Sequence, residues 1–443
     1  MTIKSSFLFA KRLIFPRSSI KSSARKSVLG AMFCIGISLI PLVVVISVSD
    51  GMIGGMTKRI IGLSSGDLQV FVARSSEYSE SRENLNGFAN LFTKIPGVAG
   101  VFPQIEGDAL AAGKNYRTGA RIRAVEPTIF SENKSFSELF NIISGSLDKF
   151  SAEKNYAVIG QKLSELLNLS PGDSFRIVTA RQNSSGTISP KVSSFKVAAI
   201  VSSGYQELDS LWVFIPLEAG FSVIPSKSAN FSVMLATDQT FSEELEAIQE
   251  ECNEIAYGAG LVYNWKELNE TQFENFSSTK VLLIFIMFLI VLVAAVNISS
   301  AIVMLVMERR REIAILKSIG GTNRGIALSF IIAGVACGLC GIVIGIPVGI
   351  LLAVNANGLV AVIEKIVNLV AKLSFVAGGG SAEAFSSIHL LNPEYYLTTI
   401  PVTVPVNEIL LICAAVIVLS FIVSILPAVN AGKEKPLDIF RKS

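Results

Sequence analysis

The chain has 443 residues, of which 51% are hydrophobic and 16% are charged, and its formal net charge is +3. Its one histidine, His389, excludes a metal cluster built from histidines and disfavours a histidine-based catalytic triad. No G-x-x-x-x-G-K-[ST] motif occurs, so the chain has no P-loop of its own. We therefore expect no catalytic residue, no metal site and no cofactor bound by this chain.

Four long apolar runs without a charged residue divide the sequence, at residues 28–49, 281–307, 326–354 and 409–429. They contain 22, 27, 29 and 21 residues, and a helix needs about 20 apolar residues to cross a bilayer. We therefore predict four transmembrane helices. The first run is longer than the apolar part of a cleaved signal peptide, about 7–15 residues, and no small-residue cleavage site follows it, so we expect it to be retained.

The first 27 residues contain seven basic residues and no acidic residue. Within them, residues 7–15 mix bulky apolar with basic side chains. This pattern is typical of an amphipathic helix lying on the cytoplasmic surface of a membrane. A short buried connector is the alternative interpretation.

Residues 50–280 alternate strand-like and helix-like patterns. Apolar residues at helical spacing predict helices at 161–169 and 242–256, and Pro171-Gly172-Asp173 predicts a turn. Stretches rich in β-branched and aromatic residues predict strands at 67–73, 121–125, 156–159, 174–178, 195–201, 211–215 and 231–235. We expect one mixed α/β domain or two small subdomains.

A polar stretch at residues 180–194 lies between two predicted strands and should protrude as a long hairpin or loop. A solvated connection is the simpler interpretation. Protruding loops on a rigid domain, however, are often where partners bind.

The segment 308–325 is predicted to continue the second membrane helix, to break at Gly320 and Gly321, and to restart with Thr322 as an N-cap. Such an elbow can carry force between a cytoplasmic partner and the membrane helices. The alternative is a basic loop that only fixes the topology.

The third apolar run contains glycines at a spacing of four residues, and small residues let transmembrane helices approach closely. We predict a helix-packing face formed by Gly334, Gly338, Gly341, Gly345 and Gly349. Residues 355–408 follow as a loop, in which residues 359–373 predict a helix along the outer membrane surface. Residues 430–443 form a short tail.

Charge predicts the orientation of the chain, because basic residues in short flanking segments stay cytoplasmic. Each of the segments 1–27, 308–325 and 430–443 has more basic than acidic residues, whereas residues 50–280 hold 20 basic and 27 acidic residues. Both termini are therefore predicted to be cytoplasmic, with the large domain and residues 355–408 outside. No predicted span carries a charged residue that could relay ions, so energy must come from a partner.

The sequence of residues 310–326, R-R-E-I-A-I-L-K-S-I-G-G-T-N-R-G-I, resembles the cytoplasmic segment of MacB/FtsX-type ABC permeases. Within that superfamily the chain most resembles the lipoprotein-releasing permeases of the LolC/LolE family. The stretches that carry this likeness are residues 36–51, 159–163, 171–173, 289–298, 393–402 and 425–428. The likeness extends over essentially the whole chain, in the same order.

The resemblance implies a polytopic α-helical protein of the bacterial inner membrane, with a MacB-like periplasmic core domain between helices 1 and 2. It also implies a second permease chain, homologous or identical, and a cytoplasmic ABC ATPase dimer that uses ATP and Mg²⁺. Such transporters extract lipoproteins from the inner membrane and pass them to a periplasmic lipoprotein carrier. The chain should contact membrane lipid and no nucleic acid.

The resemblance also implies roles for individual residues. The ATPase-coupling residues would be Arg311, Glu312, Ala314, Leu316, Lys317, Gly320, Gly321, Thr322 and Arg324. The lipid and lipoprotein cavity would be lined by Val45, Val48, Gly51, Met52, Leu282, Phe285 and Phe288. The carrier-binding hairpin would include Arg181, Gly186, Ile188 and Pro190, although its sequence does not closely match that of the family. Residues 357–388 are longer than the family norm.

Two other functions remain open from sequence. The chain could be a MacB/FtsX-like permease that exports another substrate or transmits force to a periplasmic partner. It could also be a sensor or adaptor without a transported substrate. Co-purification of an ATPase and lipoprotein sorting in a depleted strain separate these possibilities.

Overall fold

The computed structural model describes residues 6–10, 23–182, 188–377 and 401–433. The chain forms two compact units, which are described separately. The first contains residues 1–52, 276–388 and 400–443, and the second contains residues 53–275 and 389–399.

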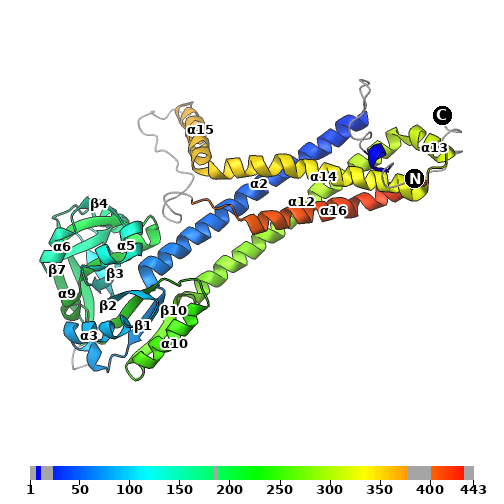
Figure 1. The fold of residues 1–443 in the computed structure, drawn as a ribbon. Coiled ribbons are helices and arrows are strands. Elements are labelled where there is room, and N and C mark those ends of the chain that lie inside the picture. The colour runs from blue at the N-terminus through cyan, green and yellow to red at the C-terminus, as the bar shows by residue number, and fades with distance from the viewer. Residues whose placement is uncertain (1–5, 11–22, 183–187, 378–400, 434–443) are drawn as a thin grey trace. The chain divides into compact units, whose positions relative to one another are not determined.

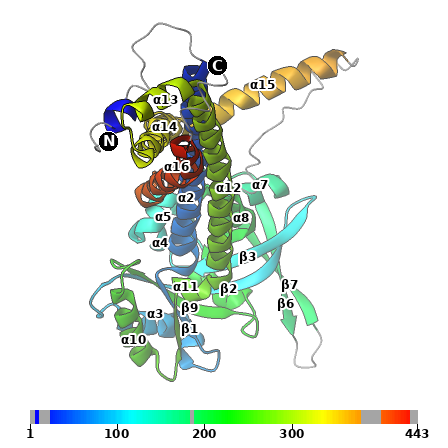
Figure 2. The same cartoon turned by 90° about the vertical axis from the view of Figure 1, so that its right-hand side faces the viewer.

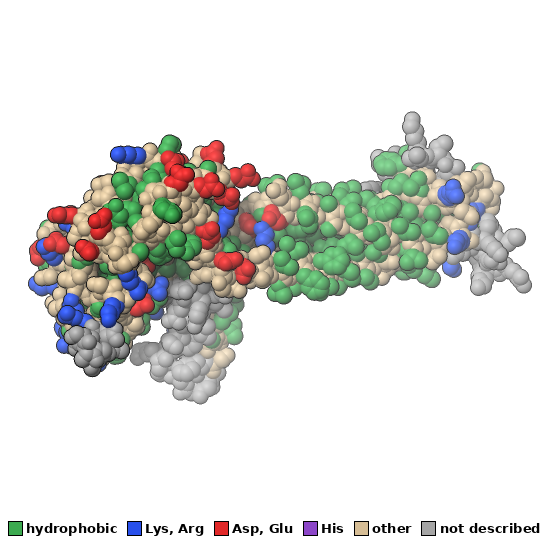
Figure 3. Space-filling view, turned by 90° about the horizontal axis from the view of Figure 1, so that it is seen from below, with side chains coloured by type: hydrophobic (Ala, Val, Ile, Leu, Met, Phe, Trp, Pro, Cys, Tyr) green, Lys and Arg blue, Asp and Glu red, His purple; other side chains and the backbone are tan. Residues whose placement is uncertain are grey.

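The first unit is built around four helices that are long and apolar enough to cross a membrane: α2 (Ser23–Arg59), α12 (Glu270–Glu308), α14 (Asn323–Val354) and α16 (Val406–Lys433) (Figure 1). Each extends beyond the corresponding predicted apolar run. Two shorter helices belong to the same unit, α13 (Arg310–Ser318) and α15 (Ala356–Ala377). Apolar side chains cover the length of the long helices, and basic side chains gather at one end (Figure 3).

The second unit is a mixed α/β domain whose main segment, residues 53–275, runs from the last turns of α2 to the start of α12. It contains a ten-stranded sheet with the order β10-β1-β9-β2-β3-β8-β5-β7-β4, and β6 pairs with β2 and β7. Most neighbours are antiparallel, but β3 pairs parallel with β8 and β5 with β7. The strands are β1 (Leu68–Val72), β2 (Val98–Ala112), β3 (Arg117–Val125), β4 (Asn141–Gly145), β5 (Tyr156–Gly160), β6 (Ser174–Gln182), β7 (Ile188–Ser202), β8 (Trp212–Pro216), β9 (Asn230–Thr237) and β10 (Gly260–Asn264).

Helices cover this sheet and enclose two apolar cores. One core packs beneath α3 (Arg82–Phe92), α7 (Gln161–Leu167), α9 (Leu217–Val223) and α10 (Glu244–Ala256). The other is rich in aromatic side chains, including those of Phe130, Phe136, Phe150, Trp212 and Phe214. The remaining short helices are η1 (Ile60–Ser65), η2 (Glu77–Ser79), α4 (Ile129–Glu132), α5 (Lys134–Leu139), α6 (Asp148–Ala152), α8 (Gln206–Leu211) and α11 (Trp265–Leu268).

All seven predicted strands and both predicted helices of this domain are present, and Gly172 adopts a φ of 93° in the predicted turn. Three strands were not predicted: β2, β4 and β10. The polar stretch 180–194 is largely an extension of the β6–β7 ladder, whose pairing continues to Gln182 and Ile188. The prediction of a hairpin is therefore confirmed, and strand pairing extends further toward its tip than the predicted strands at 174–178 and 195–201, because backbone pairing in this ribbon does not need apolar alternation.

Candidate functional site: an elbow, a helix bundle and a stalk end

The predicted elbow is a separate short helix between α12 and α14, so the expectation that α12 continues unbroken to Gly320 was wrong. α12 ends at Glu308, Arg309 interrupts the helical path, and α13 begins at Arg310. Gly320 has a φ of 95°, in the left-handed region that glycine adopts most easily. The Thr322 hydroxyl accepts a hydrogen bond of 3.2 Å from the Gly325 N–H and so caps α14, as the sequence predicted.

The elbow is fixed to the bundle by its buried face. Ile313 and Ala314 are fully buried, and Lys317 Nζ donates a hydrogen bond of 2.7 Å to the carbonyl oxygen of Gly432 in α16. At the start of α14, the hydroxyl of Ser6 donates to the Gly325 carbonyl at 3.0 Å. Ile313 also belongs to the buried apolar cluster that contains Ile326 and Phe330 of α14, so α13 is packed against the bundle as well as hydrogen-bonded to α16.

The nine predicted coupling residues do not share one surface. Ala314 is buried and Leu316, Lys317 and Gly321 are half-buried, whereas Arg311, Glu312, Gly320, Thr322 and Arg324 are exposed. The exposed side also presents Ile315 and Ile319, which are 50% and 79% exposed. Sequence reasoning missed both isoleucines, although apolar side chains exposed together on a surface helix can form part of a docking surface.

The glycine face of α14 is shared between two neighbouring helices. A Cβ atom at Gly334 or Gly338 would meet the hydroxyls of Ser424 and Ser420 in α16, at 2.0 and 2.4 Å. The other three glycines (Gly341, Gly345 and Gly349) face α2, and a Cβ at Gly345 would lie 2.6 Å from the Gly36 carbonyl oxygen. Close approach of backbones is therefore built into both contacts, and the structure supplies the neighbours that the sequence did not identify.

A cluster of charged side chains joins three helices in the same unit. Lys280 Nζ of α12 lies 3.2 Å from Asp50 Oδ1 of α2 and 2.8 Å from Glu408 Oε1 of α16. The Thr403 hydroxyl donates to Asp50 Oδ2 at 3.0 Å. All three charged side chains are about one-third exposed, at 38%, 32% and 29%. The cluster lies about 36 Å along α2 from Lys26, since a helix rises about 1.5 Å per residue, and this separation exceeds a hydrocarbon core of about 30 Å.

Replacing Lys280 with Met should loosen this end of the bundle, because Asp50 and Glu408 would then face each other without a counter-ion. We expect a loss on the order of 1 kcal/mol, since the groups are partly solvated. Thermal unfolding in lipid nanodiscs measures it. The triple variant with Asp50→Asn and Glu408→Gln should be closer to the parent than Lys280→Met alone. Equal destabilisation of both variants would contradict an electrostatic cluster.

The residues predicted to line a lipid cavity differ in their surroundings. Val45, Leu282, Phe285 and Phe288 are 41%, 59%, 59% and 48% exposed, so they offer an apolar surface to lipid or a partner. Val48 and Met52 are half-buried. Gly51 is buried, and a Cβ there would meet the carbonyl oxygen of Pro401 at 2.1 Å, so this chain's own backbone covers it.

The predicted carrier-binding hairpin corresponds to the end of the β6–β7 ribbon. Arg181 pairs with Ser189, and Pro190 pairs with Ala180. Arg181 and Pro190 are exposed. Ile188 begins β7, and Gly186 lies outside the described residues.

The stalk formed by the end of α2 and the π-helix η1 is held to the sheet by two arginines. The Arg123 side chain is 1% exposed, and its guanidinium group donates to the carbonyl oxygen of Leu63 and, at 2.5 Å, to Gln104 Oε1. Its Nε lies 3.1 Å from Glu106 Oε1, and its Cζ lies 5.0 Å from the centroid of the Trp212 ring. Burial lowers the pKa of Arg123, an effect that Glu106 opposes, and the guanidinium group remains charged at neutral pH.

The second arginine connects the stalk to the end of β7. Arg59 Nε donates to the Ser203 carbonyl oxygen at 2.6 Å. The same turn is held by the buried carboxylate of Asp209, which accepts hydrogen bonds from the hydroxyls of Ser202 and Ser203, each at 2.7 Å. Because β7 runs from this turn to the predicted hairpin, one strand links the stalk to that ribbon.

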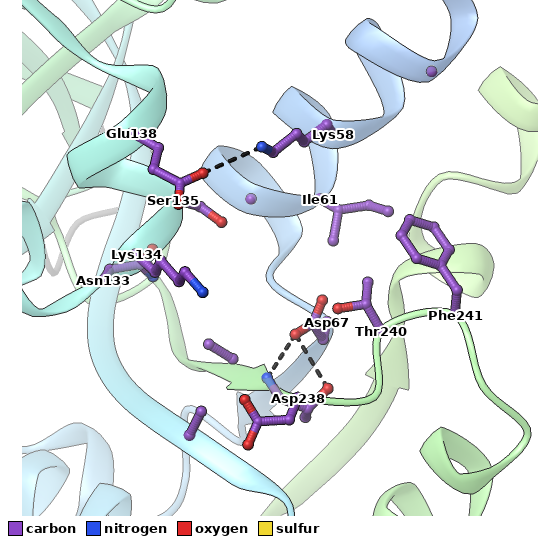
Figure 4. Close-up of a pocket in the computed structure, with 15 residues that line it drawn as sticks. Lys58, Ile61, Asp67, Asn133, Lys134, Ser135, Glu138, Asp238, Thr240 and Phe241 are labelled. Carbon is purple, nitrogen blue, oxygen red and sulfur yellow. Dashed lines mark hydrogen bonds and ion pairs between the residues drawn. The ribbon is translucent and has the colours of Figure 1, made fainter. Parts of the chain in front are cut away.

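A cavity of about 620 Å³ lies beside the stalk end, within the second unit (Figure 4). Lys58 and Glu138 form an ion pair of 3.2 Å at its edge, and both are well exposed. Asp67 lies on another wall, where its Oδ2 accepts a hydrogen bond of 2.6 Å from the Thr237 N–H. Among the described residues, no three His, Cys, Asp or Glu side chains are placed to hold a metal ion.

Asp67 should make stability depend on pH. Burial raises the pKa of this carboxyl, while hydrogen bonds from Thr237 and Thr240 oppose the shift. Between the unfolded and the folded pKa the native state binds more protons, so its stability falls as pH rises through that window. Asp67→Asn, which keeps an oxygen acceptor, should reduce this slope in urea titrations measured from pH 3 upward, and burial of Asp209, which also raises its pKa, accounts for the part that remains. An unchanged slope would contradict the assignment.

One family model matches the C-terminal part of the chain, and several known membrane proteins are similar to most of it. The family described as "FtsX-like permease C-terminal" matches residues 284–436, from α12 to beyond α16. The lipoprotein-releasing system transmembrane proteins LolC of Neisseria meningitidis serogroup B and Xylella fastidiosa strain 9a5c are 24% identical over 349 and 353 residues, which are 78% of this chain and 78% of each relative. LolE of Haemophilus influenzae is 24% identical over 349 residues, 78% of this chain and 77% of that protein.

Solved structures give more distant likenesses. The periplasmic region of MacB from Actinobacillus actinomycetemcomitans is 14% identical, with a TM-score of 0.30, and the match covers 48% of this chain and 94% of that one. The extracellular domain of the ABC-type transporter YknZ from Gram-positive bacteria is 13% identical, with a TM-score of 0.28, over 44% and 100% of the two chains.

Proposed function

We propose that this chain, which is an ABC permease of the LolC/LolE type, extracts lipoproteins from the inner membrane and hands them to a periplasmic carrier. The observation that carries the proposal is the similarity to lipoprotein-releasing permeases over 78% of the chain. The apolar runs within the four long helices, which contain no charged residue, and the capped elbow suit a permease driven by a separate ATPase and support the proposal further.

The proposed setting is the bacterial inner membrane, with both termini and α13 in the cytoplasm and the α/β unit in the periplasm. The basic residues that flank the apolar helices at 1–27, 308–325 and 430–443 support this orientation. A second permease chain, homologous or identical, would complete the membrane part.

An ATPase dimer would dock on the exposed side of α13, around Arg311, Ile315, Ile319 and Arg324. ATP and Mg²⁺ would be bound by the ATPase alone. Work is needed because each CH₂ group taken out of an apolar environment costs about 0.8 kcal/mol, and lipoprotein anchors contain several tens of them.

The force would follow contacts within each unit and the continuous helix α2. The elbow is hydrogen-bonded to α16 through Lys317, and α14 packs on both α16 and α2 through its glycines. α2 continues to Arg59 without a break, and η1 follows it directly. Arg59 and Arg123 then pass movement of the stalk to the sheet and to β7.

Two experiments test the function. Depletion of the chain should leave mature lipoproteins in the inner membrane, and normal sorting would instead support a permease for another substrate or a sensor. Ile319→Asp should reduce the ATPase that co-purifies with the chain by about tenfold, because a charge on a docking surface must be desolvated. Ile143→Asp, at an equally apolar and 53% exposed site in β4, is the matched control and should change nothing.

A further inference from the structure

The helix α15 leaves the bundle at the end of α14. Asn355 separates the two helices with φ of −95° and ψ of 18°, and its side-chain amide donates to the Leu351 carbonyl oxygen at 2.8 Å. Both helices belong to the first unit, and two views show α15 turning sharply away from the axis of α14 (Figures 1 and 2). α15 therefore runs across the direction of the membrane helices rather than along it.

One side of α15 is apolar and exposed along its length. Seven side chains form this stripe, with exposed fractions between 41% and 62%: Leu359, Val362, Ile363, Ile366, Leu369, Val370 and Leu373. At 100° per residue they fall within one arc of the helix. Glu364, Lys365 and Lys372 all fall outside this arc. This separation is typical of a helix at the boundary between water and an apolar phase.

The position of α15 identifies that phase as lipid. The stripe continues the exposed apolar surface at the end of α14, where Leu351 and Val354 are 63% and 59% exposed. From Arg324 to Asn355, α14 is about 46 Å long, since a helix rises about 1.5 Å per residue. This length crosses a hydrocarbon core of about 30 Å and leaves Asn355 at the headgroup level. A helix that turns sideways there lies in the membrane interface.

We propose that α15 lies in the headgroup region of the membrane, with its apolar stripe in contact with lipid acyl chains and its charged side toward water. The stripe would extend the membrane footprint of the permease beyond the four-helix bundle. Lipid contact by the stripe does not depend on the proposed function. Only the assignment to the outer leaflet, from which lipoproteins would be lifted, rests on it.

Spin labels can test the proposal on the full chain in phospholipid nanodiscs, after replacement of its five cysteines. Labels at Ile366 and Leu373 report on the stripe, and labels at Lys365 and Lys372 report on positions outside it. Val343 in α14, 70% exposed, is the lipid reference, and Tyr257 in the α/β unit, 90% exposed, is the water reference. Collisions with oxygen and with a water-soluble nickel chelate are measured at each site.

We expect the oxygen-to-nickel ratio at the two stripe positions to lie between those at Val343, which is deep in the bilayer, and Tyr257, and to exceed those at Lys365 and Lys372 several-fold. High nickel access at the stripe would show that it faces water, and low access to both reagents would show that protein covers it. Either result would overturn the proposal. If the cysteine-free chain is not recovered, a benzophenone amino acid at position 366 of the native chain replaces the label. Cross-linking to phospholipid then supports the proposal, and cross-linking to a second chain contradicts it.

Discussion

Gly345→Leu should prevent the four-helix unit from packing. A Cβ at this position would lie 2.6 Å from the Gly36 carbonyl oxygen and 2.9 Å from the Leu39 Cβ, so the backbones of α14 and α2 would have to separate. Overpacking of a close contact typically costs about 1–3 kcal/mol, and a rigid backbone neighbour places this site at the upper end. We therefore expect a loss of about 3 kcal/mol. Yield of the folded chain and its thermal unfolding in detergent measure the effect.

Gly30→Leu is the matched control for this prediction. Gly30 lies in α2, and nothing within 4 Å would meet a Cβ there. This variant should unfold at the same temperature as the parent. If the two leucine variants behaved alike, close approach of the helices at Gly345 would not be what holds the bundle together.

Arg123→Met should detach the stalk end from the sheet. The substitution leaves the Glu106 carboxylate, Gln104 Oε1 and the Leu63 carbonyl oxygen without the guanidinium group that they now share. Removing one partner of a buried ionic network costs roughly 3–5 kcal/mol, because the remaining groups stay buried and unpaired. Urea unfolding of the full chain, followed through Trp212 at 5.0 Å from the guanidinium carbon, reports on this site.

Arg121→Met provides a control on the same strand. The Arg121 side chain is 53% exposed and pairs with Asp108 at 3.3 Å, and such surface pairs contribute at most about 1 kcal/mol. The variant should unfold close to the parent. If both variants lost the same free energy of unfolding, Arg123 would contribute no more than a surface charge. That result would contradict a role for its buried contacts with η1.

The membrane helices could be predicted because length and the absence of charge are local signals. The same holds for the strands rich in β-branched residues. β2 was not predicted from the sequence, because its apolar pattern is interrupted by Gly100, Pro103, Glu106 and Gly107. Pairing with β3 and β9 on its two sides holds it in the sheet. Whether such a segment forms a strand depends on its pairing with neighbouring strands, and the local sequence does not contain that information.

The site residues also differ in how far the sequence could predict their surroundings. The glycine face of α14 could be read from spacing, but its division between α16 and α2 depends on how the helices are arranged. Arg121 and Arg123 lie two residues apart on one strand, so alternation gives both the same side. Their side chains are nevertheless 53% and 1% exposed, because η1 covers only the second.

The charged cluster could have been anticipated in part. Asp50, Lys280 and Glu408 directly flank three predicted apolar runs on the side predicted to be periplasmic. From the sequence alone, these three residues only mark the ends of the predicted transmembrane helices. Which of them meet depends on the packing of three helices, and sequence spacing does not contain that information.

The most direct measurement uses the permease purified with every subunit that accompanies it and reconstituted into proteoliposomes with a triacylated lipoprotein. We predict that ATP releases the lipoprotein to a soluble carrier and that a non-hydrolysable analogue does not. The Ile319→Asp variant should lose release together with the bound ATPase. Hydrolysis of ATP without any lipoprotein leaving the bilayer would contradict the account.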